Sequence, residues 1–181
     1  MKKNTRYGWL LFCCCYLLTS CNTATPENYF DRAVLNANMI FGFGDGGMPR
    51  LLESPGATLV EGSSETVPMK RSKIVEDKIA FLEGNLDKIK DLKETADTKE
   101  VLHNSLAVYN FVLPVFKKEY VQLARLYDNA APAKQIQDFA KAITIKYYSQ
   151  YQKLLNKLIA NGKVYAASHG IKLTEVNPTP Y

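Results

Sequence analysis

One stretch of the chain, residues 102–127, carries apolar side chains at alternating intervals of four and three residues. Its members are Leu102, Leu106, Tyr109, Leu113, Phe116, Tyr120, Leu123 and Tyr127. This spacing follows the turn of an α-helix and places all eight side chains on one face, which has to be buried against other helices. Pro114 interrupts the run. Because the register is the same on both sides of Pro114, we expect a kinked helix and not a reversal of the chain.

Two longer segments on either side of this run also have helical spacing. Apolar residues recur at intervals of four and three over 75–89, after Ser72, which can cap a helix. A further series over 136–165 keeps close to a 3.6-residue period for about eight turns. We expect this last helix to continue through Asn161-Gly162 and to stop at Gly170.

A shorter N-terminal helix completes the set. Thr25 and Pro26 form a helix start, and Gly42 ends the apolar pattern, so a helix is predicted over 26–41. No segment shows the two-residue period of a strand. Three long helices and one shorter helix joined by turns therefore predict an all-α, up-and-down helical bundle over 26–173.

The segment 42–72 interrupts this pattern. It contains six of the ten glycines and three prolines, and it has no periodicity. Such an insert is either a functional loop or a poorly ordered one, and we expect loose packing with at most a helical turn at 50–53. Its first six residues, GFGDGG at 42–47, match G-x-G-x-x-G. Because a helix and not a strand precedes them, we interpret them as a helix stop and turn. The prolines in the tail, 174–181, indicate fraying.

The first 20 residues have the parts of a secretory signal peptide. Its positive start consists of Lys2, Lys3 and Arg6. The apolar run 9–18 follows. As a helix it would span about 15 Å, roughly half of a bilayer core, which is typical of a cleaved signal and too short for a membrane anchor.

The sequence Leu18-Thr19-Ser20-Cys21 then resembles the lipobox of bacterial lipoproteins. The resemblance implies cleavage after Ser20, a diacylglyceryl group on Cys21, and residues 21–25 as a lipidated tether. Several acyl chains on one residue make a stable membrane anchor. The alternatives are an ordinary signal peptide in which Cys21 is incidental, or a short uncleaved anchor.

Processing at this site changes both the cysteine count and the charge. Cys13, Cys14 and Cys15 leave with the signal, so the folded part would have no thiol and no thiolate metal site. The remainder carries 20 Lys and Arg against 18 Asp and Glu, too balanced for a nucleic-acid-binding protein. The residue after Cys21 is Asn22. An aspartate at this position would resemble the signal that retains lipoproteins in the inner membrane. We therefore expect a cell-envelope protein of the outer membrane, facing the periplasm or the surface.

Three constellations have a chemical interpretation, and each has a simpler one. Glu100 and His103 have the Glu-x-x-His spacing of di-iron bundles, but no second such pair exists. His169 lies at a helix end, where its charge complements the helix dipole. Neither histidine adjoins a Ser or Asp motif typical of nucleophilic catalysis. We expect no enzyme activity, no metal, and no cofactor besides the lipid on Cys21.

Tyrosines are concentrated in the last two predicted helices. They are Tyr109, Tyr120, Tyr127, Tyr147, Tyr148, Tyr151 and Tyr165. A buried tyrosine needs a partner for its hydroxyl, which favours half-exposed seams. One interpretation is a bundle core with hydroxyls at its rim. The other is a binding groove between the two helices, formed by Tyr109, Tyr147, Tyr148 and Tyr151.

Residues 74–173 also resemble a family of uncharacterised bacterial surface lipoproteins with helical-bundle domains. The resemblance lies in DTKEVLHNSLAVYNFVLPVFKKEYVQL and in a long helix ending in VYAASHGIKL. The 42–72 insert and Pro114 depart from the family. The resemblance implies a bundle and a membrane anchor, and it brings no catalytic residues.

The first hypothesis for function is a non-enzymatic, lipid-anchored interaction module. It would bind another envelope protein, a second copy of itself or an envelope component. The alternative is an envelope lipoprotein that binds a small ligand in the tyrosine groove. A third hypothesis, an enzyme, would be favoured by a pocket with two facing carboxylates, to which nothing in the sequence points.

Overall fold

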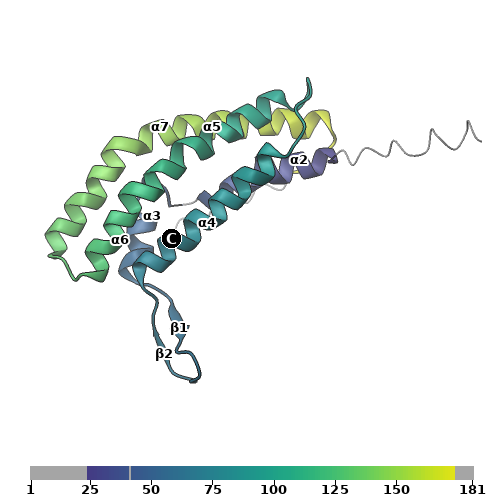
Figure 1. The fold of residues 1–181 in the computed structure, drawn as a ribbon. Coiled ribbons are helices and arrows are strands. Elements are labelled where there is room, and N and C mark those ends of the chain that lie inside the picture. Colours follow the sequence, from purple (N-terminus) through teal and green to yellow (C-terminus); the bar gives the residue numbers. More distant parts are fainter. Residues whose placement is uncertain (1–23, 41, 174–181) are drawn as a thin grey trace, which may run out of the picture.

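The computed structural model describes residues 24–40 and 42–173, and over these residues the protein is an all-α helical bundle, as predicted (Figure 1). The lipobox at Leu18–Cys21 and the tail 174–181 lie outside the described residues. In chain order the elements are α2 (Pro26–Ala33), the 3-10 helix η2 (Leu35–Ile40), α3 (Gly47–Glu53), β1 (Ala57–Leu59), β2 (Thr66–Pro68), α4 (Arg71–Lys90), α5 (Lys99–Val115), the π-helix η3 (Phe116–Tyr120), α6 (Val121–Asp128) and α7 (Ala133–Ser168). Within this described part, no helix combines the length and the hydropathy needed to span a bilayer.

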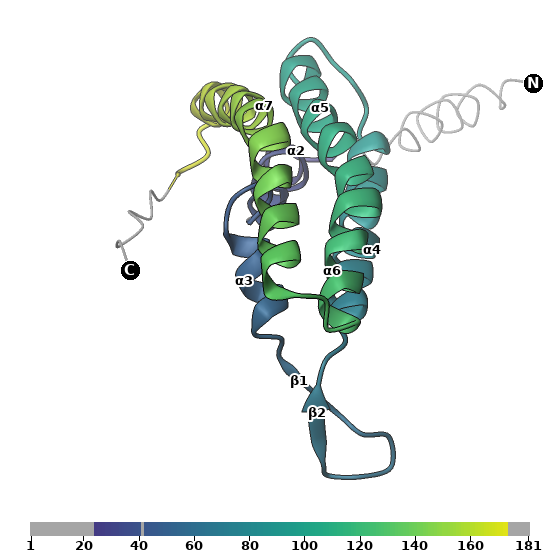
Figure 2. The same ribbon diagram turned by 90° about the vertical axis from the view of Figure 1, so that its left-hand side faces the viewer.

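The central element is the helical run α5–η3–α6, which packs against α4 on one side and α7 on the other (Figure 2). The predicted seam is confirmed, since Tyr109, Phe116 and Leu123 have no exposed surface. A second stripe that includes Val108 and Val112 is equally buried. Because two helices flank the run, it needs a wider apolar face than the seam alone provides.

Pro114 lies exposed inside α5, and the helix continues past it. The backbone changes to a π-helix over Phe116–Tyr120 and returns to an α-helix in α6. Proline has no N–H, and its ring crowds the carbonyl four residues earlier, so the helix bends here (Figure 1). The predicted kink without a reversal is confirmed.

The prediction of one N-terminal helix over 26–41 is only partly right. Thr25 caps α2 as expected, its Oγ1 accepting a hydrogen bond from the Asn28 N–H, but α2 ends at Ala33 and continues as the 3-10 helix η2. This segment packs against α7 at Gly162, where an added Cβ would lie 2.7 Å from Cγ1 of Val34. The α7 helix runs unbroken through Gly162, as predicted, and the missing side chain there gives room to Val34.

The α7 helix ends where the sequence predicted. Gly170 has a φ of +67°, and the Ile171 N–H donates to the carbonyl of Ala166 at 2.9 Å. This is the left-handed glycine stop typical of helix C-termini. The 36 residues of α7 therefore form one helix about 54 Å long.

The expectation that segment 42–72 is loosely packed is wrong for its first part. Phe43, Met48 and Leu52 are buried in the bundle core, and α3 extends the predicted turn at 50–53. The second part is the antiparallel hairpin β1–β2, which projects from the bundle with all its strand residues exposed (Figures 1 and 2). Strands of three residues are too short to show an alternating pattern, so they could not be predicted from residue spacing.

The predicted capping role of Ser72 is also wrong. The start of α4 is capped by Asp128, whose Oδ1 and Oδ2 accept hydrogen bonds from the N–H groups of Arg71 and Ser72, each at 2.9 Å. Partial burial of Asp128 raises its pKa, but these hydrogen bonds outweigh that effect, so the pKa of Asp128 lies below its ordinary value. The cap joins the end of α6 to the start of α4.

Candidate binding groove

The structure separates the four tyrosines that the sequence grouped into a groove. Tyr109 of α5 has no exposed surface, and Tyr151 of α7 is only 4% exposed. Tyr147 is half-buried, and Tyr148 lies at the surface. Two of the four therefore present no ring surface to a ligand, and the predicted open tyrosine groove is wrong as a single site.

Phe43 fills the space between the tyrosine-rich helices. Its ring centroid lies 4.8 Å from that of Tyr151, 5.6 Å from that of Phe116 and 5.9 Å from that of Tyr120. The next residue, Gly44, donates its N–H to the Tyr120 hydroxyl at 2.7 Å. Burial raises the pKa of Tyr120 and of Tyr151 to about 12 each. The protein's own glycine-rich loop therefore occupies the place where a ligand was expected.

The alternative interpretation, a tyrosine core with hydroxyls at the rim, holds for part of the set. Tyr127 reaches the carbonyl of Pro49 at 3.4 Å, and Tyr147 reaches Glu119. The Tyr109 hydroxyl instead lies in the interior, beside the side chain of Asn85.

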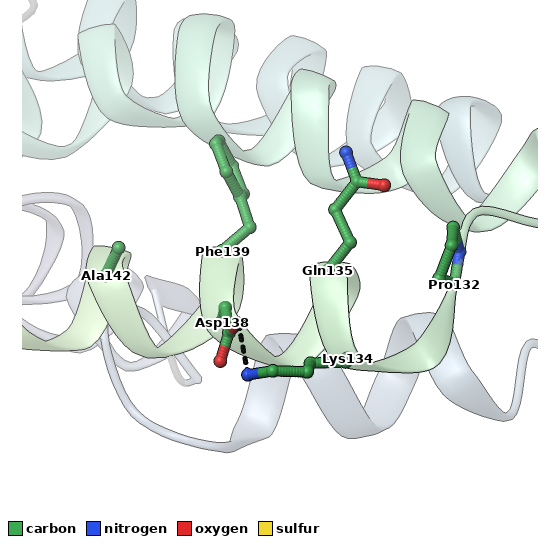
Figure 3. A pocket seen from close by; sticks show the side chains of 6 residues that line it. All are labelled: Pro132, Lys134, Gln135, Asp138, Phe139 and Ala142. Carbon is green, nitrogen blue, oxygen red and sulfur yellow. Dashed lines mark hydrogen bonds and ion pairs between the residues drawn. The ribbon is translucent and has the colours of Figure 1, made fainter.

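A different recess lies between η3 and α7, and it continues into an open hollow along the start of α7. A recess of about 150 Å³ is lined by Glu119, Phe139, Ala142, Ile143, Lys146 and Tyr147. It adjoins an open hollow of about 570 Å³ lined by Pro132, Lys134, Gln135, Asp138, Phe139 and Ala142 (Figure 3). Because Phe139 and Ala142 belong to both, we treat the two as one and call them the α7 groove. Of the four predicted tyrosines, only Tyr147 lines it.

The floor of the α7 groove is apolar. Figure 3 shows Phe139 and Gln135 projecting from α7 toward the facing helix, with Ala142 one turn farther along. Lys134 and Asp138, which also line the hollow, form an ion pair at 2.8 Å and point away from the facing helix. The lining is mainly apolar and open to solvent, which is typical of a docking surface for another apolar chain.

The inner end of the groove carries a fixed polar contact. The Tyr147 hydroxyl donates to Glu119 Oε1 at 2.9 Å, and Lys146 Nζ lies 3.8 Å from the same oxygen. Lys146 also lies 4.9 Å from the centroid of the Tyr147 ring, and the contact with Tyr147 raises the pKa of Lys146. These contacts hold Glu119, whose side chain is only 15% exposed, as an oriented hydrogen-bond acceptor.

Neither Phe139 nor Ala142 belongs to a pattern that predicts a site from the sequence. Each stands one position before a member of the α7 seam, Ala140 or Ile143, and so lies one step around the helix from the buried face. The only sequence signal for the groove was an apolar residue next to the row of buried apolar residues on α7. It was weak because a single flanking apolar residue is common on protein surfaces.

The histidines take structural positions. His103 Nε2 lies 2.8 Å from Glu94 Oε2, and both side chains are about half exposed. The His169 ring stacks on Tyr165 with centroids 4.2 Å apart, at the C-terminal end of α7. In the described ranges, 24–40 and 42–173, no three His, Cys, Asp or Glu side chains come close enough to hold a metal.

The GFGDGG loop forms the predicted helix stop and turn, with φ of +87° at Gly42 and +71° at Gly44. Contrary to expectation, a short helix, α3, follows it directly. The carboxylate of Asp45 accepts a hydrogen bond from the Gly47 N–H at 2.6 Å. An acidic side chain of the loop thus stands at the place where a phosphate-binding loop would hold an anion.

Among protein-family models, curated proteins and solved structures, none matches this chain.

Proposed function

We propose that this chain is a lipid-anchored, non-enzymatic protein of the bacterial cell envelope, whose bundle binds an apolar segment of another envelope protein in the α7 groove. The observation that carries the binding role is the apolar surface of the half-buried Phe139 and the exposed Ala142, which line both parts of the groove. The same groove supplies a rigid acceptor at Glu119, which can fix the register of a bound segment.

The lipid anchor is proposed from the N-terminal sequence. The lipobox Leu18–Cys21, preceded by a positive start and a ten-residue apolar run, supports lipidation of Cys21. The resemblance to bacterial surface lipoproteins supports the same anchor. Helix α2 begins at Pro26, so the tether is short and the bundle stands close to the bilayer.

A protein segment fits the groove better than a small ligand does. Pockets for small ligands bury most of the ligand surface, whereas the larger part of the α7 groove is an open trough along a helix. A trough of this kind suits an amphipathic helix or an extended chain that places apolar side chains on Phe139 and Ala142. Against the small-ligand alternative, the ring of Phe43 packs on Tyr151 and Tyr120 in the space between the tyrosine-rich helices.

The anchor is tested at Cys21. Cells grown with a labelled fatty acid should label the natural chain, and the Cys21→Ser variant should carry no label and accumulate with its signal attached. Inhibition of lipoprotein signal peptidase should leave the natural chain about 2 kDa heavier, since about twenty residues would remain. An unlabelled natural chain with a free thiol at position 21 would rule out the anchor.

The groove is tested by photo-crosslinking in intact cells. A photoreactive amino acid replaces Ala142 in the groove or, as a matched control, the exposed Ala80 of α4. We expect a defined adduct with an envelope protein from position 142 only, and its loss when Phe139→Asp is introduced as well. The same adducts from both positions, or an adduct that persists with Phe139→Asp, would contradict binding in the groove.

A further inference from the structure

Positive charge is concentrated on one helix. Over its 36 residues α7 contains six lysines, Lys134, Lys141, Lys146, Lys153, Lys157 and Lys163, and a single acidic residue, Asp138. The rest of the chain after the predicted signal peptide carries 14 basic and 17 acidic residues. The near-neutral net charge is therefore the sum of a basic helix, α7, and a slightly acidic remainder of the chain.

The outward side of α7 combines these lysines with exposed apolar residues. Ile145 is 74% exposed and Ile159 is 38% exposed. Lys141 precedes Ile145, Lys153 lies between the two isoleucines in the sequence, and both lysines are exposed. At about 100° per residue, these four positions fall within roughly a third of the helix circumference. We call them the α7 outer face. Lys141 and Lys153 form no ion pair with any of the described residues.

The helix that follows the predicted tether packs on α7. Helix α2 packs beside the C-terminal part of α7, where Val34 meets Gly162. The five tether residues 21–25 can extend by at most about 17 Å, which exceeds the roughly 10 Å diameter of one helix. A lipid on Cys21 can therefore be inserted in a bilayer while α7 lies on the surface of that bilayer.

We propose that the α7 outer face rests on the anionic surface of the membrane that holds the lipid anchor. Lys141 and Lys153 would meet headgroup phosphates, and Ile145 and Ile159 would enter the boundary between headgroups and acyl chains. Basic helices with a few apolar residues bind such interfaces by these two effects together. The inference rests on the proposed lipid anchor, and it adds that a protein face, as well as the lipid, touches the bilayer.

The test uses the purified, lipidated protein, whose only cysteine is blocked by its lipid. Ile145→Cys then offers one free thiol for a polarity-sensitive fluorophore, and Phe81→Cys on α4, where Phe81 is 43% exposed, offers a matched control. In vesicles that contain phosphatidylglycerol, we expect the emission of the label at position 145 to rise about twofold or more and to shift to shorter wavelength. In vesicles of phosphatidylcholine alone that rise should be much smaller, and the label at position 81 should not respond in either.

The same fluorescence response is then measured in lysine variants and at high salt. Lys141→Gln combined with Lys153→Gln should abolish the response at position 145, whereas Lys73→Gln combined with Lys90→Gln on α4 should preserve it. Half-molar salt should weaken the response, because lysine–headgroup attraction is screened.

The outcomes separate the face from the anchor. If the labelled protein floats with the vesicles and position 145 does not respond, the anchor stands and the outer-face inference is wrong. If the protein neither floats nor responds, both are wrong. Equal responses at positions 145 and 81 would also overturn the inference. A response at position 145 to DNA without vesicles, as strong as that to the anionic membrane, would assign the face to an anionic polymer instead.

Discussion

The buried ring of Phe43 offers the most direct test of how the glycine-rich loop is held. Phe43→Ala removes a side chain that has no exposed surface and lies against the rings of Tyr151 and Phe116. Truncation of a core phenylalanine lowers the free energy of unfolding by about 3–5 kcal/mol, through lost burial and the cavity that remains. We expect about 4 kcal/mol here. For a domain of this size that corresponds to a fall in Tm of about 8–16 °C.

The measurement is chemical and thermal unfolding followed by circular dichroism. Phe81→Ala is the matched control, because Phe81 is 43% exposed on α4 and its truncation should change the free energy of unfolding by less than about 1 kcal/mol. The cavity left at position 43 should be apolar. A small aromatic such as benzene should therefore raise the Tm of Phe43→Ala without affecting the natural chain.

Two results would refute this reasoning. If Phe43→Ala unfolds within about 1 kcal/mol of the natural chain, the loop is not part of the core. If Phe81→Ala is destabilised as much as Phe43→Ala, the loss does not come from the aromatic cluster around Phe43.

Three further substitutions test local features. Asp128→Ala should lower the free energy of unfolding by about 1 kcal/mol at pH 7, by loss of the cap on α4. The pKa of Asp128 is lower in the folded protein than in the unfolded chain, so its contribution to the free energy of unfolding is present above the unfolded pKa and is lost as pH falls through the folded pKa. The free energies of unfolding of the natural chain and of Asp128→Ala, measured against pH, should therefore converge below about pH 4. In α4, Gly84→Ala should stabilise by about 0.5–1 kcal/mol because nothing lies within 4 Å of the new Cβ, whereas Gly162→Ala should destabilise because that Cβ would meet the Val34 side chain at 2.7 Å. Opposite signs in denaturant unfolding are the check, and equal gains would contradict the packing of Val34 on α7. Tyr120→Phe should cost about 1–3 kcal/mol and speed hydrogen exchange of the Gly44 amide, because a buried N–H loses its acceptor; unchanged exchange would argue against this hydrogen bond.

The long helices could be predicted because their side chains repeat with the helical period over many turns. The seam through Tyr109 and Phe116 kept its register across Pro114, and the register indicated one bent helix. The stop at Gly170 followed from the intrinsic freedom of glycine to adopt positive φ. Each of these predictions depends on residues that are neighbours in the chain.

The features that were missed depend on contacts between distant residues. The carboxylate that caps α4 comes from Asp128, 57 positions after Arg71. Phe43 packs in the core because Tyr151 and Phe116 meet it there, and no periodic pattern surrounds it. The groove at Phe139 arises where α7 and η3 leave space between them, which sequence spacing does not encode. Such features follow from tertiary packing, and local propensity does not reveal them.

The hairpin β1–β2 leaves the bundle and returns at nearly the same place. The Met69 N–H donates to the carbonyl of Gly56 at 2.8 Å, and Nε of Arg71 donates to the carbonyl of Leu52 at 3.1 Å. Because both ends of the excursion are fastened to each other, its length is not constrained by the helices. A peptide epitope inserted after Gly62, or a shortened turn in place of 57–68, should add or remove only the modest entropy of closing a loop. Evolution and engineering alike can therefore exchange this projection for another while the helical body stays as it is.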